Sequence, residues 1–335
     1  MRITTSMMSN KYIKNLNKSA YEMNKLSEKV ETGRKFVKGS EDPVSAIKAY
    51  KLRREYRTTE IYDTNIQDVE SFLTAAETSL TEISNNLESV YTSYLKGING
   101  TMNADDREII AKQLENLQRS ILTSLNAKFE DRYVFGGTSK EEIPFTVKDG
   151  VLHFKGINLN TSEDADGNFV NLEDLANETI HIDLGLGMTF DGDAKLNTDT
   201  VFDMSMSGIK FMGFGETADG NPMNLYNLIG KIKEKLVSDS FSLDDEMISY
   251  IDEFEKQKNQ VLVHITDIGS KTNYLDFLKT RNEDNLFNLN KKLLEVEFED
   301  PAEAIVNFKM QEYSYNAALS MGNRILQNSF IDFMK

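Results

Sequence analysis

Apolar residues follow a helical spacing in both end regions of the chain, and a different spacing in the middle. In residues 10–32, Leu16, Met23 and Val30 recur every seven positions. Such a stripe gives a helix one apolar face that needs a partner helix. We therefore predict a helix over residues 10–32 that ends at Gly33, because glycine readily takes the left-handed conformation that stops a helix.

The strongest periodic signal lies further along the N-terminal region. Apolar residues there alternate spacings of three and four without a break, which predicts four heptads of a coiled-coil seam. The seam residues are Ile66, Val69, Leu73, Ala76, Leu80, Ile83, Leu87, Val90 and Tyr94. Glycines end this helix at Gly97 to Gly100, and a third helix is expected from about Asp105 to about residue 135, before Gly136.

Two helix starts share the same Asp-Pro step. Asp42 precedes Pro43, and Asp300 precedes Pro301. An aspartate can accept hydrogen bonds from the free amides of a first helical turn, and proline at the first helical position has no amide to satisfy. Both steps therefore mark the beginning of a long helix.

The C-terminal region is expected to form a helix over residues 223–280, then a helix over 283–297 or a continuation of the first, and a last helix from Pro301 almost to Lys335. The last helix carries a stripe in heptad register, interrupted by Glu312. Its members are Ile305, Phe308, Tyr315, Leu319, Gly322, Leu326 and Phe333.

The middle of the chain has a β-type pattern. Residues 136–221 contain 12 of the 19 glycines, and residues 143–215 alternate apolar and polar side chains. Asp-Gly pairs such as Asp149-Gly150 favour tight hairpin turns. These features predict a small β-rich module inserted between two helical regions.

The fold class is therefore predicted to be mainly α. We expect an elongated helical coiled-coil rod, formed by the N- and C-terminal segments, with an inserted β-rich domain. The expected division is terminal helices for assembly at 1–40 and 301–335, the helical rod at 41–137 and 222–300, and the β-rich domain at 138–221.

Charge narrows the classes of partner. The net charge of −16 argues against a nucleic-acid partner, since phosphate binding needs clustered Lys and Arg. The charge is uneven: residues 136–221 hold 16 acidic and 5 basic residues, whereas residues 1–60 hold 14 basic and 7 acidic ones. No apolar run is long enough for a membrane span, and we expect no cleaved secretory signal at the N-terminus.

Residues typical of catalysis or metal binding are sparse. The chain has no cysteine, and His153, His181 and His264 lie far apart in the sequence. Two Gly-x-Gly steps lack the rest of a phosphate-binding pattern. The acidic segment 162–168 lacks the ligand order of a calcium loop, so an acidic turn is favoured there. We predict no catalytic, cofactor or metal residues, and no enzyme activity.

A set of ordered motifs resembles the flagellin superfamily, and within it the proteins of the hook–filament junction. The N-terminal motifs are Met1-Arg2-Ile3-Thr4, Leu26-Ser27, Thr32-Gly33-Arg34-Lys35 and Ser40-Glu41-Asp42-Pro43. The step from helix to insert carries Arg132-Tyr133-Val134-Phe135-Gly136-Gly137. The C-terminal motifs are Ile268-Gly269-Ser270-Lys271, Asn273-Tyr274-Leu275, Gln311, Tyr315-Asn316-Ala317-Ala318-Leu319 and Ser329.

This resemblance implies a structural adaptor of the bacterial flagellum, outside the cell and exported without a cleaved signal peptide. It implies as partners the first hook-associated protein, flagellin, further copies of the chain in a ring and an export chaperone, with no nucleic acid and no membrane. The residues expected at the assembly interface are Leu16, Met23, Leu26, Val30, Ile305, Phe308, Tyr315, Leu319, Leu326 and Phe333.

Three other interpretations stay open at this point. A flagellin filament subunit would share the terminal helices, and the Arg132–Thr138 step is the main reason to prefer the junction. A cytoplasmic coiled-coil scaffold would explain the Ile66–Tyr94 seam. It would explain neither the β-type insert nor the ordered motifs. An enzyme with its site in the acidic insert is the third.

Overall fold

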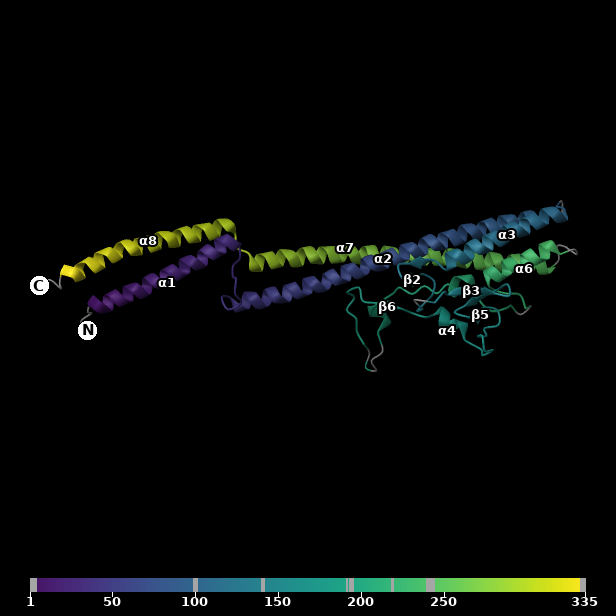
Figure 1. The fold of residues 1–335 in the computed structure, drawn as a ribbon, viewed down its shortest axis with the longest axis horizontal. Helices are drawn as coiled ribbons and strands as arrows, with labels where there is room; N and C mark the ends of the chain where they lie inside the picture. The colour runs from purple at the N-terminus through teal and green to yellow at the C-terminus, as the bar shows by residue number, and fades with distance from the viewer. Residues whose placement is uncertain are drawn as a thin grey trace. The chain divides into compact units, whose positions relative to one another are not determined.

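The computed structural model describes residues 5–98, 102–139, 142–190, 192, 196–217, 220–238 and 245–331, except for the side chains of 5, 245–246 and 323–331. The chain divides into two compact units, in which distant segments come together. Unit 1 contains Met1–Glu60 and Glu283–Lys335, and unit 2 contains Ile61–Asn282. The prediction of a mainly α fold with a β-containing insert is confirmed (Figure 1).

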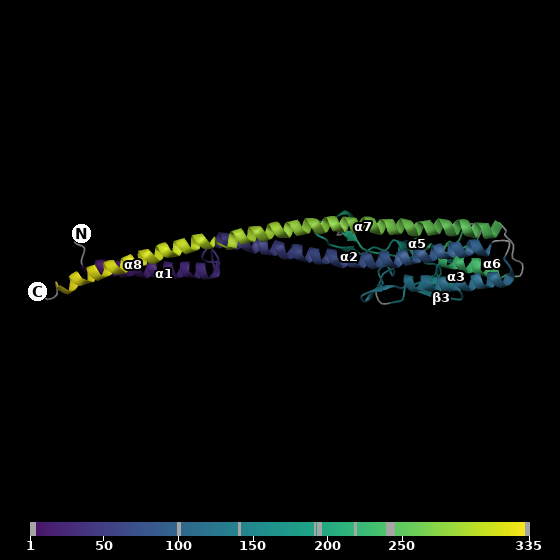
Figure 2. The ribbon, with the colours of Figure 1, turned by 90° about the horizontal axis from the view of Figure 1, so that it is seen from above.

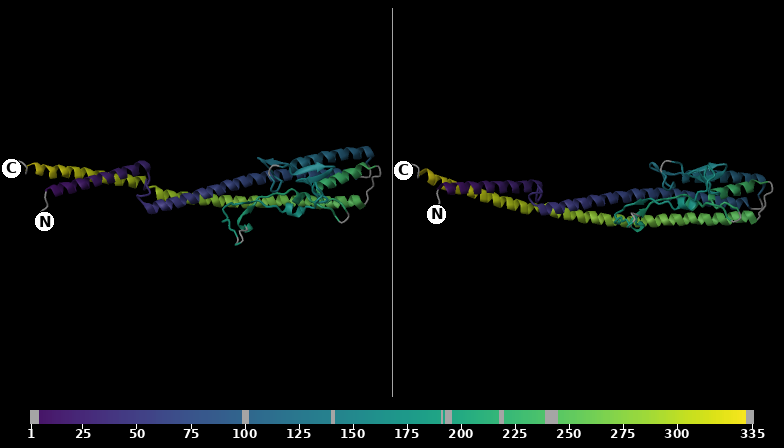
Figure 3. Two further views of the ribbon diagram at one scale, coloured as in Figure 1. Left: turned by 60° about the horizontal axis from the view of Figure 1, so that its bottom comes forward. Right: turned by 90° about the horizontal axis from the view of Figure 1, so that it is seen from below.

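Unit 1 is built from helices of both chain ends. It contains α1 (Thr5–Thr32) and α8 (Pro301–Ile331), with the first turns of α2 (Pro43–Gly97) and the last turns of α7 (Asp245–Glu297). Helices α1 and α8 lie side by side, as Figures 1, 2 and 3 show. The first helix was predicted correctly except for its start, which lies five residues earlier than expected.

Helix ends in unit 1 follow from local chemistry. Helix α1 stops because Gly33 takes a φ of +68°, and its amide still donates to the Lys29 carbonyl at 2.8 Å. Asp42 Oδ1 accepts from the Ser45 amide at 3.1 Å, and Asp300 Oδ1 accepts from the Ala302 amide at 2.8 Å. Both Asp-Pro steps therefore cap helices as predicted.

Unit 2 is organised around the predicted seam of α2. Every residue of the stripe from Ile66 to Tyr94 has at most 2 % of its surface exposed. The opposing side chains come from α7, which runs antiparallel: Tyr94 Oη lies 3.4 Å from the Met247 carbonyl, and Lys279 Nζ lies 3.1 Å from Glu70. The α7 residues buried in the same core are Met247, Tyr250, Phe254, Val261, Ile268, Leu275 and Leu278.

Helix α3 (Ala104–Leu125) is shorter than predicted. The expected helix reached about residue 135, but residues after Leu125 form a hairpin of β1 (Lys128–Phe129) and β2 (Arg132–Tyr133). The physical reason lies in Asn126, whose side-chain amide bonds both backbone groups of Phe145, at 2.9 and 3.0 Å. This long-range pairing fixes the helix end, and no local signal encodes it.

The remaining helices also divide differently from the prediction. The expected helix over 223–280 is two helices, α6 (Leu225–Val237) and α7, and α7 continues without a break from Asp245 to Glu297. Helix α6 packs beside α3, where the Gln118 amide donates to the Tyr226 carbonyl at 2.8 Å. Ser238 follows α6, and serine residues favour helix ends because their side chains compete for backbone hydrogen bonds.

The insert contains short strands together with short helices. Strands β3 (Phe145–Lys148), β4 (Val151–Phe154) and β5 (Ile157–Asn158) form one antiparallel sheet, and β6 (His181–Ile182) pairs with β7 (Phe202–Asp203). Between β3 and β4, Asp149 and Gly150 both have positive φ, 53° and 82°, as a two-residue hairpin turn requires. The short helices are α4 (Leu172–Ala176), the 3₁₀ helix η1 (Thr198–Thr200) and α5 (Ile209–Met212).

The insert shares one continuous hydrophobic core with the helices of unit 2. Phe135, Phe145 and Phe211 belong to the same cluster as the α2 seam. The β4 amide of Leu152 also donates to Asn227 Oδ1 of α6, at 2.9 Å. The core of the helices in unit 2 therefore includes side chains of the insert. Alternation along β4 buries every second residue, and these side chains need the helices as cover.

Loss of one seam residue tests the core directly. Leu80 has no exposed surface, so Leu80→Ala should lower the free energy of unfolding by about 2–5 kcal/mol. The exposed neighbour Thr81 supplies the control, and Thr81→Ala should leave the value nearly unchanged. Denaturant unfolding followed by circular dichroism measures both. Equal losses in the two variants would contradict a packed seam at this position.

Candidate assembly surfaces

The seam between α1 and α8 is built from polar and small residues as well as apolar ones. The Tyr12 hydroxyl donates to the Ala318 carbonyl at 2.9 Å, and the Gln311 amide donates to Ser19 Oγ at 3.0 Å. At the loop end of the pair, Lys29 and Glu299 form an ion pair at 3.1 Å. These contacts define an antiparallel register that brings the two ends of the chain together.

A close approach at the far end of this seam explains one glycine. Gly322 is buried against the phenol ring of Tyr12, and a Cβ atom at that position would overlap the Tyr12 hydroxyl. A larger residue at this position would therefore require the Tyr12 ring or the two helices to shift. The heptad pattern placed Gly322 in the stripe of the last helix. It did not predict that the Tyr12 side chain packs against this glycine.

The α1–α8 seam covers its apolar side chains only in part. Leu16, Met23 and Leu26 on α1 are half-buried, and so are Phe308 and Tyr315 on α8. The other predicted interface residues within the described side chains are more exposed, namely Val30 at 36 %, Ile305 at 48 % and Leu319 at 41 %. Leu326 and Phe333 lie outside the described side chains. The assignment of these ten residues to an assembly interface stays a prediction.

Helix α8 carries a second apolar face that sequence reasoning missed. Val306, Met310, Tyr313 and Met321 are exposed by 57–78 %. At about 100° per residue, Val306 points roughly opposite to buried Ala304, so this face is turned away from α1. The outer α8 face, defined by these four residues, is available for contacts with other chains.

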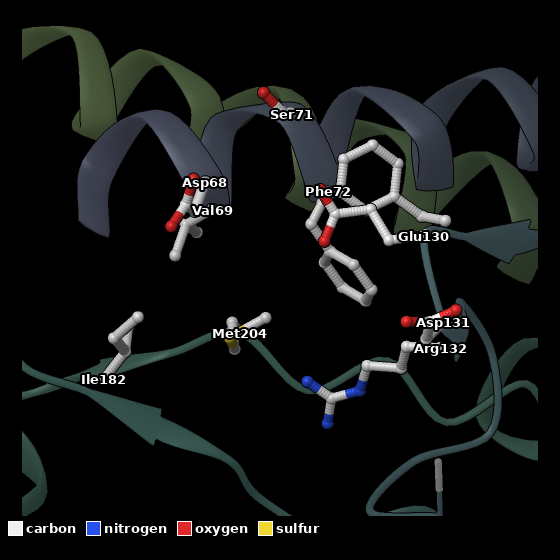
Figure 4. Close-up of a pocket in the computed structure, with 10 residues that line it drawn as sticks. Asp68, Val69, Ser71, Phe72, Glu130, Asp131, Arg132, Ile182 and Met204 are labelled. Atoms are coloured by element: carbon white, nitrogen blue, oxygen red, sulfur yellow. The ribbon is translucent and has the colours of Figure 1, made fainter. Parts of the chain in front are cut away.

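In unit 2, a cavity of about 430 Å³ lies between α2 and the β1–β2 hairpin (Figure 4). Phe72 and Val69 of α2 form one wall, and Arg132 extends beneath Phe72 with its guanidinium carbon 5.7 Å from the ring centroid. The remaining lining residues are Asp68, Ser71, Phe129, Glu130, Asp131, Ile182 and Met204.

Arg132 is the chemically distinctive group of this cavity. Its Nε is buried and has no hydrogen-bond partner in the described part of the chain. Burial lowers the pKa of the Arg132 guanidinium, because its charged form loses contact with water. The cavity can accept a side chain or water with a hydrogen-bond acceptor for the Arg132 Nε.

The backbone step at Gly137 and Thr138, after Arg132, is held by a partly buried carboxylate. Glu178 Oε2 accepts from the Thr138 amide at 3.0 Å, from its hydroxyl at 2.8 Å and from Lys155 Nζ at 2.8 Å. Burial raises the pKa of Glu178, but these donors outweigh it and hold the pKa below its usual range. The Gly137 turn is therefore fastened to the insert by an ionised Glu178.

Over the residues that the structure describes, no three His, Asp or Glu side chains converge in a manner suited to a metal ion. Among the described helices, none is long and apolar enough to cross a membrane.

The N-terminal part of the chain is similar to a known protein family. Residues 3–140 match the family model of the bacterial flagellin N-terminal helical region. Among known proteins, the chain is similar to flagellar hook-associated protein 3 of Salmonella typhimurium, with 26 % identity over 154 residues. The same protein of Escherichia coli is 26 % identical over 151 residues.

The matched segment spans 46 % of this chain and 49 % of the Salmonella protein, so it covers about half the length of that relative. Solved structures share the fold over more of the chain. A flagellar hook-associated protein from Vibrio parahaemolyticus has a TM-score of 0.61 at 22 % identity, covering 77 % of this chain and 100 % of the other. FlgL of Bacillus cereus has a TM-score of 0.51 at 16 % identity, covering 73 % of this chain and 99 % of the other. The resemblance to the flagellin superfamily is thereby confirmed.

The Glu178 anchor predicts a pH-dependent stability. Glu178→Gln should cost about 1–3 kcal/mol at pH 7, because it removes charge-assisted hydrogen bonds. A lowered pKa in the folded state stabilises the fold above the unfolded pKa, and this stabilisation is lost as pH falls through the folded pKa. The gap in melting temperature between wild type and variant should therefore shrink below about pH 4.5. Exposed Glu142→Gln is the control, and a gap that widens in acid would refute the anchor.

The Tyr12–Gly322 notch predicts a specific clash. Gly322→Ala should separate α1 from α8 locally and speed proteolysis of α1, because the new methyl group overlaps the Tyr12 hydroxyl. Tyr12→Ala in the same chain removes the whole ring that the methyl group would meet, and should restore part of the protection. Exposed Ser320→Ala serves as the control. Unchanged proteolysis in Gly322→Ala would show that the two helices do not pack at this level.

Proposed function

We propose that this chain is a structural adaptor at the hook–filament junction of the bacterial flagellum, joining the first hook-associated protein to flagellin. The observation that carries the proposal is the pairing of the two chain ends into α1 and α8, with the outer α8 face left exposed. The similarity to flagellar hook-associated protein 3 supports the same role.

The geometry of unit 1 suits assembly better than binding of a small ligand. Its seam leaves apolar side chains half-covered, and only further protein can cover the outer α8 face. In the proposed role, residues 1–40 and 301–335 make the assembly contacts and residues 41–137 with 222–300 form the supporting rod. Residues 138–221 form the inserted domain. Copies of the chain form a ring, and no catalysis is part of this role.

The route to that position follows from the same role. The chain leaves the cell through the flagellar export channel without a cleaved signal peptide, and an export chaperone covers its apolar ends beforehand. Covering these ends avoids premature association, because exposed apolar stripes on helices bind one another readily.

A flagellin filament subunit is the second candidate. A flagellin subunit would use the same pair of helices, α1 and α8. Self-assembly of the purified chain distinguishes the two roles. Purified flagellin grows long filaments when seeded, whereas an adaptor stops at a short ring. The third possibility, a cytoplasmic scaffold, would give a small fixed oligomer and no role outside the cell.

The decisive experiment uses a bacterial strain from which the gene is deleted. We expect hooks without filaments and flagellin secreted into the medium, with filaments restored by the wild-type chain. Met310→Glu with Tyr313→Glu should fail to restore them, because both changes place charges on the outer α8 face. Phe169→Glu, at a side chain that is 76 % exposed on the insert, should restore filaments. Normal filaments in the deletion strain would overturn the proposal.

A further inference from the structure

The first turns of α2 present an exposed face of mixed aromatic, aliphatic and basic character. On the packed side, Ala49 is only 4 % exposed. On the opposite side, Ile47 is 59 % and Tyr50 is 70 % exposed, and they alternate with exposed Lys51, Arg54 and Arg57. We call these five residues the basic α2 face. At about 100° per residue they occupy one side of the helix.

Two cations of unit 1, Arg53 and Lys29, form ion pairs within the unit, unlike those of the basic α2 face. Arg53 lies 2.5 Å from Glu297, and Lys29 lies 3.1 Å from Glu299. Lys51, Arg54 and Arg57 make no side-chain hydrogen bond or ion pair with any described residue. Three unpaired cations beside an exposed tyrosine and isoleucine favour an acidic surface that also carries apolar side chains.

The turn between α7 and α8 carries exposed apolar and acidic side chains, and Lys35 of the same unit donates to its Glu295 carbonyl at 2.6 Å. Leu294 is 48 %, Phe298 39 % and Ile305 48 % exposed. Glu295 and Glu303 are exposed beside them. We call these five residues the acidic turn. Its inward-pointing acids, by contrast, already have cationic partners within unit 1.

The basic α2 face and the acidic turn lie at the same level along the helices of unit 1. The Arg53–Glu297 ion pair joins the neighbouring residues of the two surfaces directly. Copies placed side by side in the same direction would therefore bring one chain's basic face against the next chain's acidic turn without an axial shift. Two different patches meeting in this way make a head-to-tail contact, which closes into a ring when the rotation fits.

We propose that the basic α2 face binds the acidic turn of a neighbouring copy of this chain. This inference rests on the proposed function, in which copies form a ring, and it specifies the surfaces that join them. Opposite charges fix the register of the contact, and the apolar residues of both surfaces become covered.

Cysteine cross-linking tests the contact without competing native disulfides, because the chain has no cysteine of its own. Cells of the deletion strain would express Arg54→Cys and Glu295→Cys as two separate chains, so that any disulfide must join two molecules. We expect a cross-linked dimer after mild oxidation of isolated flagella. Neither variant alone should give one, and Arg54→Cys with Glu163→Cys, an exposed residue of the insert, should give none.

A charge exchange identifies the partner surface. Arg54→Glu and Glu295→Arg should each reduce the number of filaments per cell, and the two changes in one chain should restore it. Cross-links from Arg54→Cys alone would indicate a symmetric contact and overturn the proposal, as would the absence of any dimer in the mixed cells. Failure of the wild-type chain to restore filaments would instead reject the proposed function, so the two failures are distinguishable.

Discussion

Burial of heptad stripes between antiparallel helices is the interaction on which the rest of the structure depends, and it is unequal along the chain. In unit 2 the α2 stripe is covered completely by α7 and by side chains from α3, α6 and the insert. In unit 1 the α1–α8 seam contains Ser19, Gln311 and Gly322 and leaves Leu16 and Phe308 half-exposed. Because hydrophobic stabilisation scales with the apolar area removed from water, unit 2 has a self-sufficient core and the terminal pair does not.

Polar residues within the α1–α8 seam specify how the two helices align. The Gln311–Ser19 hydrogen bond and the Tyr12–Ala318 hydrogen bond can each form in only one register of the two helices. A polar pair inside a coiled coil lowers its stability while specifying its alignment. Such a pair suits helices that must be aligned correctly and yet take most of their apolar cover from neighbouring molecules. The family motif residues Gln311 and Ala318 both lie in this seam, which gives their presence a physical reason.

Much of the fold could be predicted from local signals. The Ile66–Tyr94 stripe, the Asp-Pro helix starts and the Asp149-Gly150 hairpin each depend on residues close in sequence, and each is confirmed. The end of α3 could not be predicted, because Asn126 stops it by bonding to Phe145. Likewise, the shared core of insert and helices depends on contacts between distant segments.

The candidate site was predictable at the level of helices and less so at the level of side chains. Apolar periodicity selected Ile305 and Leu319 for the stripe of the last helix, whereas the structure turns their smaller neighbours Ala304 and Ala318 inward. Hydrophobicity alone favours the bulkier residue, whereas small residues such as Ala304 and Gly322 lie on the packed side of α8. The outer α8 face follows from this packed side, and the basic α2 face follows from the packing of Ala49. Both surfaces are defined by which side of a helix is packed, and periodicity alone does not determine that side.

Hydrogen exchange, measured residue by residue in the free chain and in assembled flagella, tests the central claim most directly. We expect the amides of α2 around Leu73 and Leu80 to exchange slowly in both states, because their seam is complete within one chain. The amides of α1 and α8 should exchange rapidly in the free chain and become strongly protected on assembly. Equal, strong protection of α1 and α8 in a verified monomer would contradict the claim that the terminal pair depends on its neighbours.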